Sequence, residues 1–260
     1  MSQKTPDEPR SIKAIQTTGK IINALESQNG AGVTELANLL NVSKGTIHTH
    51  LNTLRRDGFV TKDEQTYYLS LQFLKLGESA RQRYDFSDIL SREVEELAND
   101  LDVRAQVLVS EGGKGVCLYV SSGPNAMKQS LTTGEFDHLH YTAAGKAILA
   151  HLPEERVSDI LDQHGLPAPT ENTITDRDKL FEDLEKTRQR GYSVNREEKI
   201  PGLVGIGVPF RNKDGCVLAS ISVAVPSSEV TGTNRETEIA NRVRQCKNKA
   251  EVNLRLSSRR

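Results

Sequence analysis

The stretch VTELANLLNVSKGTIHTHLNTLRRDGFV, residues 33–60, constrains the fold more than any other part of the chain. Two short helical patterns flank the polar turn Asn41-Val42-Ser43, and apolar residues recur in each of them at helical spacing. Ser43 is placed to cap the second helix, and Gly58 suits the left-handed position that follows its end near Asp57. Two short helices joined by such a tight turn predict a helix-turn-helix unit.

The second of these helices separates a buried seam from a polar face. At about 100° per residue, Ile47, Leu51 and Leu54 fall within about 60° of one another and form the seam. The opposite face carries small polar and cationic side chains, and residues 43–56 contain no acid. Such side chains suit hydrogen bonding to base edges and phosphates. We therefore predict a DNA-binding face here, whereas the alternative is an ordinary solvated helix surface.

The two histidines of this helix fall on different sides of it. His48 flanks the polar face, while His50 falls close to the buried seam at the same spacing of about 100° per residue. We therefore expect His50 to be a partly buried packing residue and His48 to be a contact residue.

A further helix and a hairpin complete the unit. Apolar spacing predicts a helix that begins at a Ser11 cap and ends near Gln28, and Thr34 is placed to cap the next helix. Two β-rich runs on either side of residues 62–65 predict a hairpin. Three helices followed by a hairpin make a winged helix-turn-helix, whose last helix enters the major groove. The residues predicted to contact DNA are Ser43, Lys44, Gly45, Thr46, His48, Thr49, Asn52, Arg56 and, on the wing, Lys62.

These residues resemble the DNA-binding domain of the IclR family of transcriptional regulators. Thr49 stands where the family often has Arg, and His50 stands for a Leu. The stretches YYLSLQFLKLGESA, HYTAAGKAILAHLP and RGYSVNREEKIPGLVGIGVPFRNKDGCVLASISVAVP resemble the family's linker helix and two segments of its effector-binding domain. The resemblance implies an α+β chain: a winged helix-turn-helix domain over 11–72, and a linker helix with a GAF-like effector-binding domain over 73–257. Residues 1–10 are expected to form a disordered tail.

Beyond residue 73, helical and β-rich patterns alternate. Helices are expected near residues 74–84, 89–101, 142–152, 176–190 and 235–254, and strands near 105–110, 115–121, 192–195, 202–210 and 217–225. Such a mixture of strands and flanking helices independently suggests an α+β sensor domain.

The effector site has two sources of expectation. The small residues at 142–146 begin a helix, where they could receive an anion on backbone N–H groups or simply allow close packing on the sheet. The resemblance implies a carboxylate site at Ala143, Ala144, Asn195, Gly205, Ser222 and Ala224. Asn195, Gly205 and Ala224 replace an Asp, a Cys and a Ser of family members. Fewer side-chain donors and more room predict a larger or less polar effector, such as an organic or sugar acid.

The sequence gives little support for an enzyme or for a membrane protein. The glycines at 112–115 fit a hairpin turn, no GxSxG elbow occurs, and Cys117, Cys216 and Cys246 have no metal-ligand spacing. The net charge of −1 conceals the local cationic patch, and no apolar run could span a membrane. We expect a cytoplasmic regulator without catalytic residues, metal or cofactor, a homodimer or tetramer that binds a double-stranded operator. The alternative is a small-molecule sensor whose winged helix contacts protein.

Overall fold

The computed structural model describes residues 11–127, 132–230 and 234–257, in two compact units that divide between Ala80 and Arg81. The expected disordered tail at 1–10 lies outside the described residues. Within these ranges, no helix combines the length and apolarity needed to cross a membrane.

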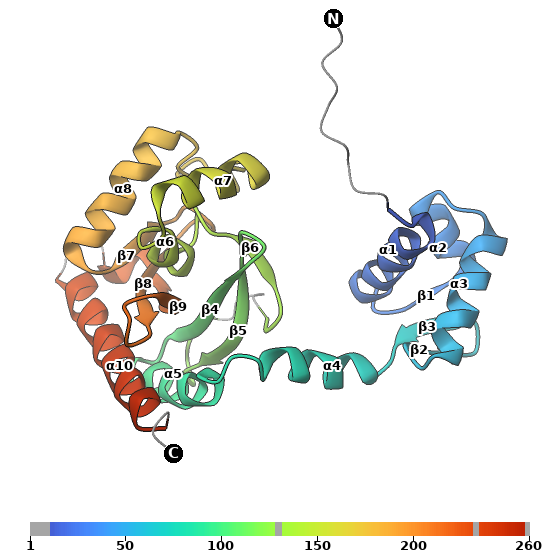
Figure 1. Cartoon of the computed structure of the whole chain (residues 1–260), viewed down its shortest axis with the longest axis horizontal. Helices are drawn as coiled ribbons and strands as arrows, with labels where there is room; N and C mark the ends of the chain where they lie inside the picture. The colour runs from blue at the N-terminus through green and yellow to red at the C-terminus, as the bar shows by residue number, and fades with distance from the viewer. Residues whose placement is uncertain (1–10, 128–131, 231–233, 258–260) are drawn as a thin grey trace, which may run out of the picture. The chain divides into compact units, whose positions relative to one another are not determined.

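The N-terminal unit is a winged helix-turn-helix (Figure 1). Its elements are α1 (Lys13–Ser27), β1 (Ala31–Gly32), α2 (Val33–Leu40), α3 (Lys44–Arg56), β2 (Val60–Asp63) and β3 (Thr66–Leu69). The strands form an antiparallel sheet in the order β1-β3-β2. The predicted seam residues Ile47, Leu51 and Leu54 are buried and pack with Ile21 and Leu36 in one apolar core.

The caps of this unit agree with the sequence only in part. Ser43 caps α3 as predicted, because its Oγ accepts from the Thr46 amide at 3.2 Å. The caps predicted at Ser11 and Thr34 are wrong: Ile12 and Gly32 occupy those positions. Before α2, the Glu35 carboxylate accepts from the Gly32 amide at 2.7 Å. This contact satisfies the backbone amide of the N-cap residue itself.

The C-terminal unit follows α4 (Gln72–Arg81), which buries none of its side chains. Its helices are α5 (Ser87–Leu101), α6 (Ala143–Leu149), α7 (Glu154–His164), α8 (Arg177–Arg190), α9 (Ser227–Val230) and α10 (Arg235–Ser257). Its strands are β4 (Arg104–Glu111), β5 (Lys114–Ser122), β6 (Phe136–His138), β7 (Ser193–Arg196), β8 (Leu203–Arg211) and β9 (Val217–Pro226). The predicted helix over 142–152 is shorter in the structure, and α7, α9, β1 and β6 were not predicted.

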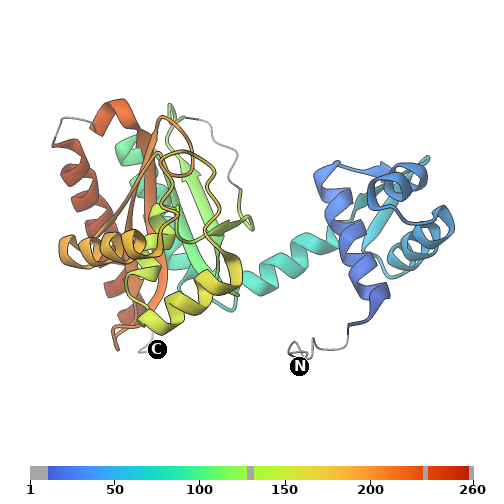
Figure 2. The same cartoon turned by 90° about the horizontal axis from the view of Figure 1, so that it is seen from above.

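All six strands pair antiparallel in the order β6-β5-β4-β9-β8-β7. Helices α5 and α10 pack on one face, where α10 runs alongside the strands (Figure 2). Neighbouring residues of β4 serve opposite faces: Val107 belongs to the core under α5 and α10, whereas Leu108 belongs to the core under α6, α7 and α8. This alternation follows the two-residue period of a strand, so the polar Arg104 and Gln106 lie on the α6 face.

Candidate DNA-reading face and effector pocket

The polar side of α3 is exposed and keeps its acid-free composition. Lys44, Thr46, His48, Thr49 and Asn52 are all exposed, as are Ser43, Gly45 and Arg56. The structure therefore leaves every α3 residue of the predicted DNA-binding set accessible.

Several of these side chains already make hydrogen bonds within the helix. The Thr49 hydroxyl donates to the Gly45 carbonyl at 3.0 Å, and Asn52 Nδ2 donates to His48 Nδ1 at 3.2 Å. The Ser43 hydroxyl lies 2.8 Å from that of Thr46 while it caps the helix. Asn52 and His48 therefore offer a linked amide and imidazole to a partner, while the Thr49 hydroxyl retains its lone pairs.

His50 differs from His48, as the helical angles predicted. It is partly buried, and its Nδ1 lies 2.8 Å from the Thr18 hydroxyl of α1. This contact ties α3 to α1, so His50 is a packing residue.

The wing has a two-residue turn at Glu64 and Gln65, tighter than the predicted turn over 62–65, because Lys62 and Asp63 pair with Tyr67 and Thr66 in the hairpin. The Lys62 ammonium lies 5.4 Å from the centre of the Tyr67 ring. Lys62 is exposed on β2 and available to an anion, although the neighbouring Asp63 is exposed too.

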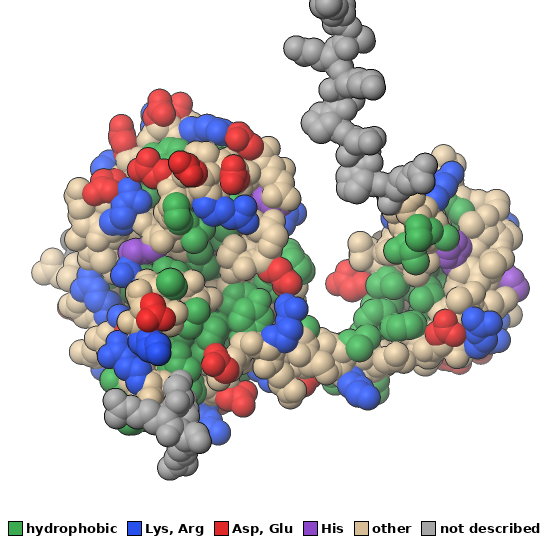
Figure 3. Space-filling view, in the orientation of Figure 1, with side chains coloured by type: hydrophobic (Ala, Val, Ile, Leu, Met, Phe, Trp, Pro, Cys, Tyr) green, Lys and Arg blue, Asp and Glu red, His purple; other side chains and the backbone are tan. Residues whose placement is uncertain are grey.

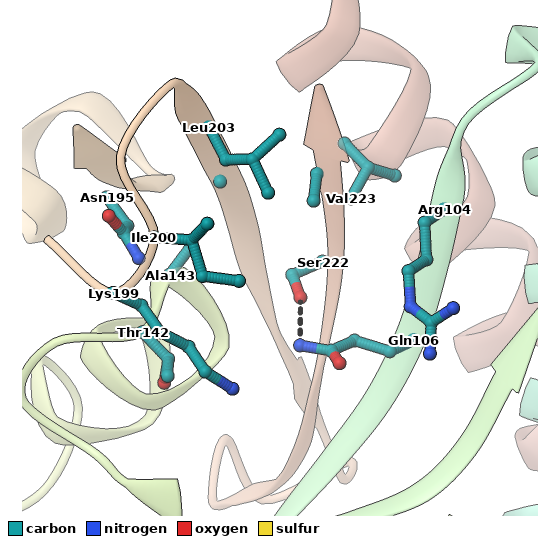
Figure 4. Close-up of a pocket in the computed structure, with 12 residues that line it drawn as sticks. Arg104, Gln106, Thr142, Ala143, Asn195, Lys199, Ile200, Leu203, Ser222 and Val223 are labelled. Carbon is teal, nitrogen blue, oxygen red and sulfur yellow. Dashed lines mark hydrogen bonds between the residues drawn. The ribbon is translucent and has the colours of Figure 1, made fainter. Parts of the chain in front are cut away.

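A pocket of about 630 Å³, open mouth included, lies between the α6 face of the sheet and the loop that joins β7 to β8 (Figure 4). The residues that line it are Arg104, Gln106, Thr142, Ala143, Asn195, Lys199, Ile200, Leu203, Gly205, Ser222, Val223 and Ala224.

Five of the six expected effector residues line this pocket, and Ala144 does not. Ala144 is fully buried and belongs to the core between α6 and the sheet. Gly205 gives α6 room, because a Cβ added there would lie 3.0 Å from that of Ala143. Close packing on the sheet thus accounts for part of the small-residue stretch at 142–146.

The polar contribution of β4 to the pocket was not predicted from the sequence. Arg104 and Gln106 reach the pocket, and Gln106 Nε2 donates to Ser222 Oγ at 3.0 Å (Figure 4). Arg104 and Gln106 alternate with the buried Ala105 and Val107, so the strand period carried this signal. Lys199, Ile200 and Leu203 come from the loop and from the start of β8, where no simple period operates.

Asn195 uses its side-chain amide to hold the loop between β7 and β8, which forms one wall of the pocket. Its Nδ2 donates to the Tyr141 carbonyl at 2.6 Å, and its Oδ1 accepts from the Glu198 amide at 2.7 Å. These two bonds fix the loop against the start of α6. Asn195 therefore shapes the pocket through the backbone more than through donors offered to a ligand.

Behind the wall, Lys146 is fully buried with two carboxylates. Its ammonium lies 2.5 Å from Glu198 Oε1 and 2.8 Å from Asp183 Oδ2. Burial raises the pKa of Glu198, while Lys146 opposes that effect. The arrangement joins α6, α8 and the pocket loop, and it keeps the buried ammonium paired.

A second ion pair stands at the pocket edge. Lys199 pairs with Asp137 of β6, whose carboxylate also accepts the Tyr141 hydroxyl at 2.6 Å. Burial and this carboxylate raise the pKa of Tyr141, so the phenol stays protonated and donates. Asp137 thus holds two neighbours of the pocket at once.

The side chains of His138, His140 and His164 lie close together, although the residues are separated in the sequence. The ring of His138 lies 5.8 Å from that of His140 and 6.2 Å from that of His164. The outer two donate through Nε2 to the carbonyls of Pro167 and Gly112. In the parts of the chain that the structure describes, no three His, Cys, Asp or Glu residues are arranged to hold a metal ion.

Comparisons with known proteins match both units. The family described as "Bacterial transcriptional regulator IclR C-terminal" matches residues 79–252, and the "IclR helix-turn-helix domain" matches residues 14–64. The probable HTH-type transcriptional regulator ArcR of Halobacterium salinarum is 32% identical over 95% of each chain.

Two solved structures share the fold. The IclR crystal structure of Thermotoga maritima has a TM-score of 0.76 at 25% identity and covers 93% of this chain and 97% of that one. An IclR homologue of Microbacterium hydrocarbonoxydans, solved with 4-hydroxybenzoate, has a TM-score of 0.80 at 18% identity and covers 94% and 100%.

Proposed function

The chain belongs to the IclR family of transcriptional regulators, and from this premise we propose that α3 reads a palindromic operator under the control of the C-terminal pocket. Its relatives are regulators and not enzymes, and regulators of this family bind DNA through the helix-turn-helix domain and small effectors through the C-terminal domain. The observation that carries the proposal is the exposed, acid-free side of α3.

We assign the residues of α3 to two roles. Lys44, Thr46, His48, Thr49 and Asn52 reach base edges, whereas Ser43, Arg56 and Lys62 hold phosphates. Gly45 allows close approach of the helix backbone, since a Cβ at this position would meet only the Ser43 hydroxyl, at 4.0 Å. Side chains of these types supply the amide, hydroxyl and cationic contacts that direct readout in the major groove uses.

A palindromic operator needs two reading heads at a fixed spacing, about 34–36 Å or a multiple of it. Apolar side chains exposed on α1 and around α4 support dimerisation through these two helices. Ile12, Ile15, Leu71 and Leu74 are each more than 65% exposed, and apolar side chains show on this unit in Figure 3. Burial of such surface in a homodimer removes it from water, and a tetramer then pairs two dimers.

The effector is an organic acid held in the pocket by Ala143, Asn195, Gly205, Ser222 and Ala224. Ala144, the sixth expected residue, packs in the core between α6 and the sheet and does not line the pocket. The neighbour solved with 4-hydroxybenzoate supports an acid in this fold. For the acid to control DNA binding, it must bind the two arrangements of the dimer with different affinity. We place the end of the winged helix-turn-helix domain at residue 72, with the linker helix after it, and the site of action in the cytoplasm, with the operator DNA.

Fluorescence anisotropy with labelled fragments from upstream of the protein's own gene tests the proposal. Two reading heads, each with Arg56 and Lys62 on phosphates, predict a fall of affinity with a log–log salt slope of about −4. Addition of cell metabolites should change the affinity. Failure to bind any fragment at low ionic strength would instead favour a winged helix that contacts protein, and binding without salt dependence would exclude the phosphate contacts of Arg56 and Lys62.

A further inference from the structure

Two cations line the effector pocket, on walls formed by different elements. Arg104 enters from the beginning of β4, and Lys199 enters from the loop between β7 and β8 (Figure 4). Among the described residues that line the pocket, none is an Asp or Glu. The lining therefore favours anions at two separate places.

The lining between these two cations has a polar part and an apolar part. The pair of Gln106 and Ser222 lies between them, with the Gln106 amide already bonded to the Ser222 hydroxyl. Ile200 and Leu203 supply the apolar side of the cavity (Figure 4). A ligand that spans this space meets a guanidinium, a short polar and apolar stretch, and an ammonium.

We propose that the effector of this pocket is a dicarboxylate, with one carboxylate bound by Arg104 and the other by Lys199. This inference rests on the proposed function, because it identifies the class of acid that the regulatory site takes. It also adds Arg104 and Lys199 to the residues that determine effector specificity.

The two cations suit these carboxylates in different ways. A guanidinium can pair with a carboxylate through two parallel N–H bonds, which fixes the orientation of that end. Lys199 is paired with Asp137, but an ammonium has three donors, and its side chain remains about a quarter exposed. Asp137 keeps the Tyr141 hydroxyl as a donor when Lys199 turns towards a ligand.

A monocarboxylate can make only one of these two contacts. Loss of one charge-assisted hydrogen bond weakens binding roughly ten- to hundredfold. An uncharged ligand loses both contacts. The pocket should therefore rank dicarboxylates above monocarboxylates of equal carbon number, and both above the corresponding diamides.

Isothermal titration of the full chain, without DNA, tests this ranking. The probes are the linear dicarboxylates from malonate to adipate with malate and 2-oxoglutarate, and monocarboxylates of the same carbon numbers. At least one dicarboxylate should bind tenfold or more tightly than its matched monocarboxylate. If none binds, or if monocarboxylates bind equally well, the inference is overturned.

Variants then locate the two ends. Arg104→Gln and Lys199→Gln should each weaken the best dicarboxylate at least tenfold, whereas Lys179→Gln, an exposed lysine on α8, should change nothing. Binding of the monoamide of that acid separates direct contact from a structural role. One of the two variants should bind the monoamide nearly as well as the native chain does, because the lost cation faces the neutral end. Equal losses for diacid and monoamide in both variants would overturn the inference.

The outcome is independent of DNA binding. If dicarboxylates bind but no operator fragment does, the proposed function fails while the ligand class stands. If the chain binds its operator and is released only by monocarboxylates or neutral compounds, the reverse holds. Circular dichroism of each variant at 25 °C verifies that the fold persists.

Discussion

At the scale of single residues, one polar side chain can serve the scaffold or a partner, and hydrogen bonds decide between these uses. Asn195 lines the pocket, yet it is buried, and its amide donates to Tyr141 and accepts from Glu198. Asn52 on α3 has one contact, with His48, and stays exposed. An amide with unused donors and acceptors in solvent is the one suited to read a base edge.

Substitution of Asn52 should therefore change sequence preference. We expect Asn52→Ala to reduce discrimination between the operator and a mutated site by about 1–3 kcal/mol, because an amide can pair with one base edge. The same discrimination should fall in Thr49→Ala. Competition anisotropy with single-base operator variants measures it.

Lys62→Ala should act differently, because a phosphate contact carries no sequence information. It should weaken all DNA sequences similarly and reduce the magnitude of the salt slope by about 1 per reading head. Lys20→Ala, an exposed lysine on α1, provides the control. A uniform loss in Asn52→Ala, or a sequence-dependent loss in Lys62→Ala, would contradict the assignment of these two residues.

The helical period predicted the buried seam of α3 and the different environments of His48 and His50, because both depend only on angles along one helix. The pairing of Lys146 with Glu198 and Asp183 could not be found in this way. These three residues meet only after α6, α8 and the loop before β8 have packed. The same holds for Lys199 and Asp137.

At the scale of elements, α6 owes its position to a very close approach to the preceding chain. A Cβ added to Gly145 would lie 2.2 Å from the carbonyl oxygen of Leu139 and 2.5 Å from its Cα. Both atoms belong to the backbone and cannot turn away. The start of α6, which carries Ala143 to the pocket, is therefore fixed by a glycine.

Gly145→Ala should lower the free energy of unfolding by about 3 kcal/mol or more and weaken effector binding. Gly19→Ala is the matched control, because nothing lies within 4 Å of its added Cβ in α1. That substitution should stabilise the chain by up to about 1 kcal/mol. Urea unfolding followed by circular dichroism compares the two, and native stability in Gly145→Ala would contradict the predicted clash.

The missed elements have identifiable physical causes. β1 has two residues and β6 has three, so each depends on a distant partner strand and carries almost no periodic signal. α7 is different: its buried residues Val157, Ile160 and Leu161 recur at helical spacing after Pro153. That signal was present in the sequence, because proline favours the beginning of a helix as much as it ends the preceding one.

At the scale of the whole molecule, α4 is a helix without a buried side chain. The Leu74 side chain is 71% exposed. If the proposed homodimer buries it, Leu74→Asp should give a monomer at micromolar concentration, because a charge cannot be buried unpaired. Ser79→Asp, an exposed position on the same helix, should stay dimeric. Sedimentation velocity distinguishes these states, and a dimeric Leu74→Asp would exclude this surface.

The response to acid also belongs to the whole fold. Burial lowers the pKa of His140 to about 4, from an ordinary value of 6.5. The His140 side chain of the unfolded chain therefore binds a proton below pH 6.5, whereas that of the folded chain binds it only below about pH 4. The free energy of unfolding should therefore decrease as the pH is lowered through this interval, and His140 contributes at most about 3 kcal/mol to the decrease.

Burial shifts the pKa of His138 and of His151 in the same direction, so the test compares slopes. His140→Gln, which retains a donor for Pro167, should show a smaller loss of unfolding free energy between pH 7.5 and 4.5. Identical slopes in the native chain and in His140→Gln would exclude His140 as the cause.

The division between Ala80 and Arg81 leaves each unit with its own apolar core. A genetic crossover within the codons of α4 would therefore cut through no packed interior on either side. Such an event would join an existing DNA-binding unit to an effector-binding unit of different specificity, or an existing effector-binding unit to a DNA-binding unit that recognises other promoters. Regulators built in this way can diversify by exchange of halves, a faster route than stepwise change at either site.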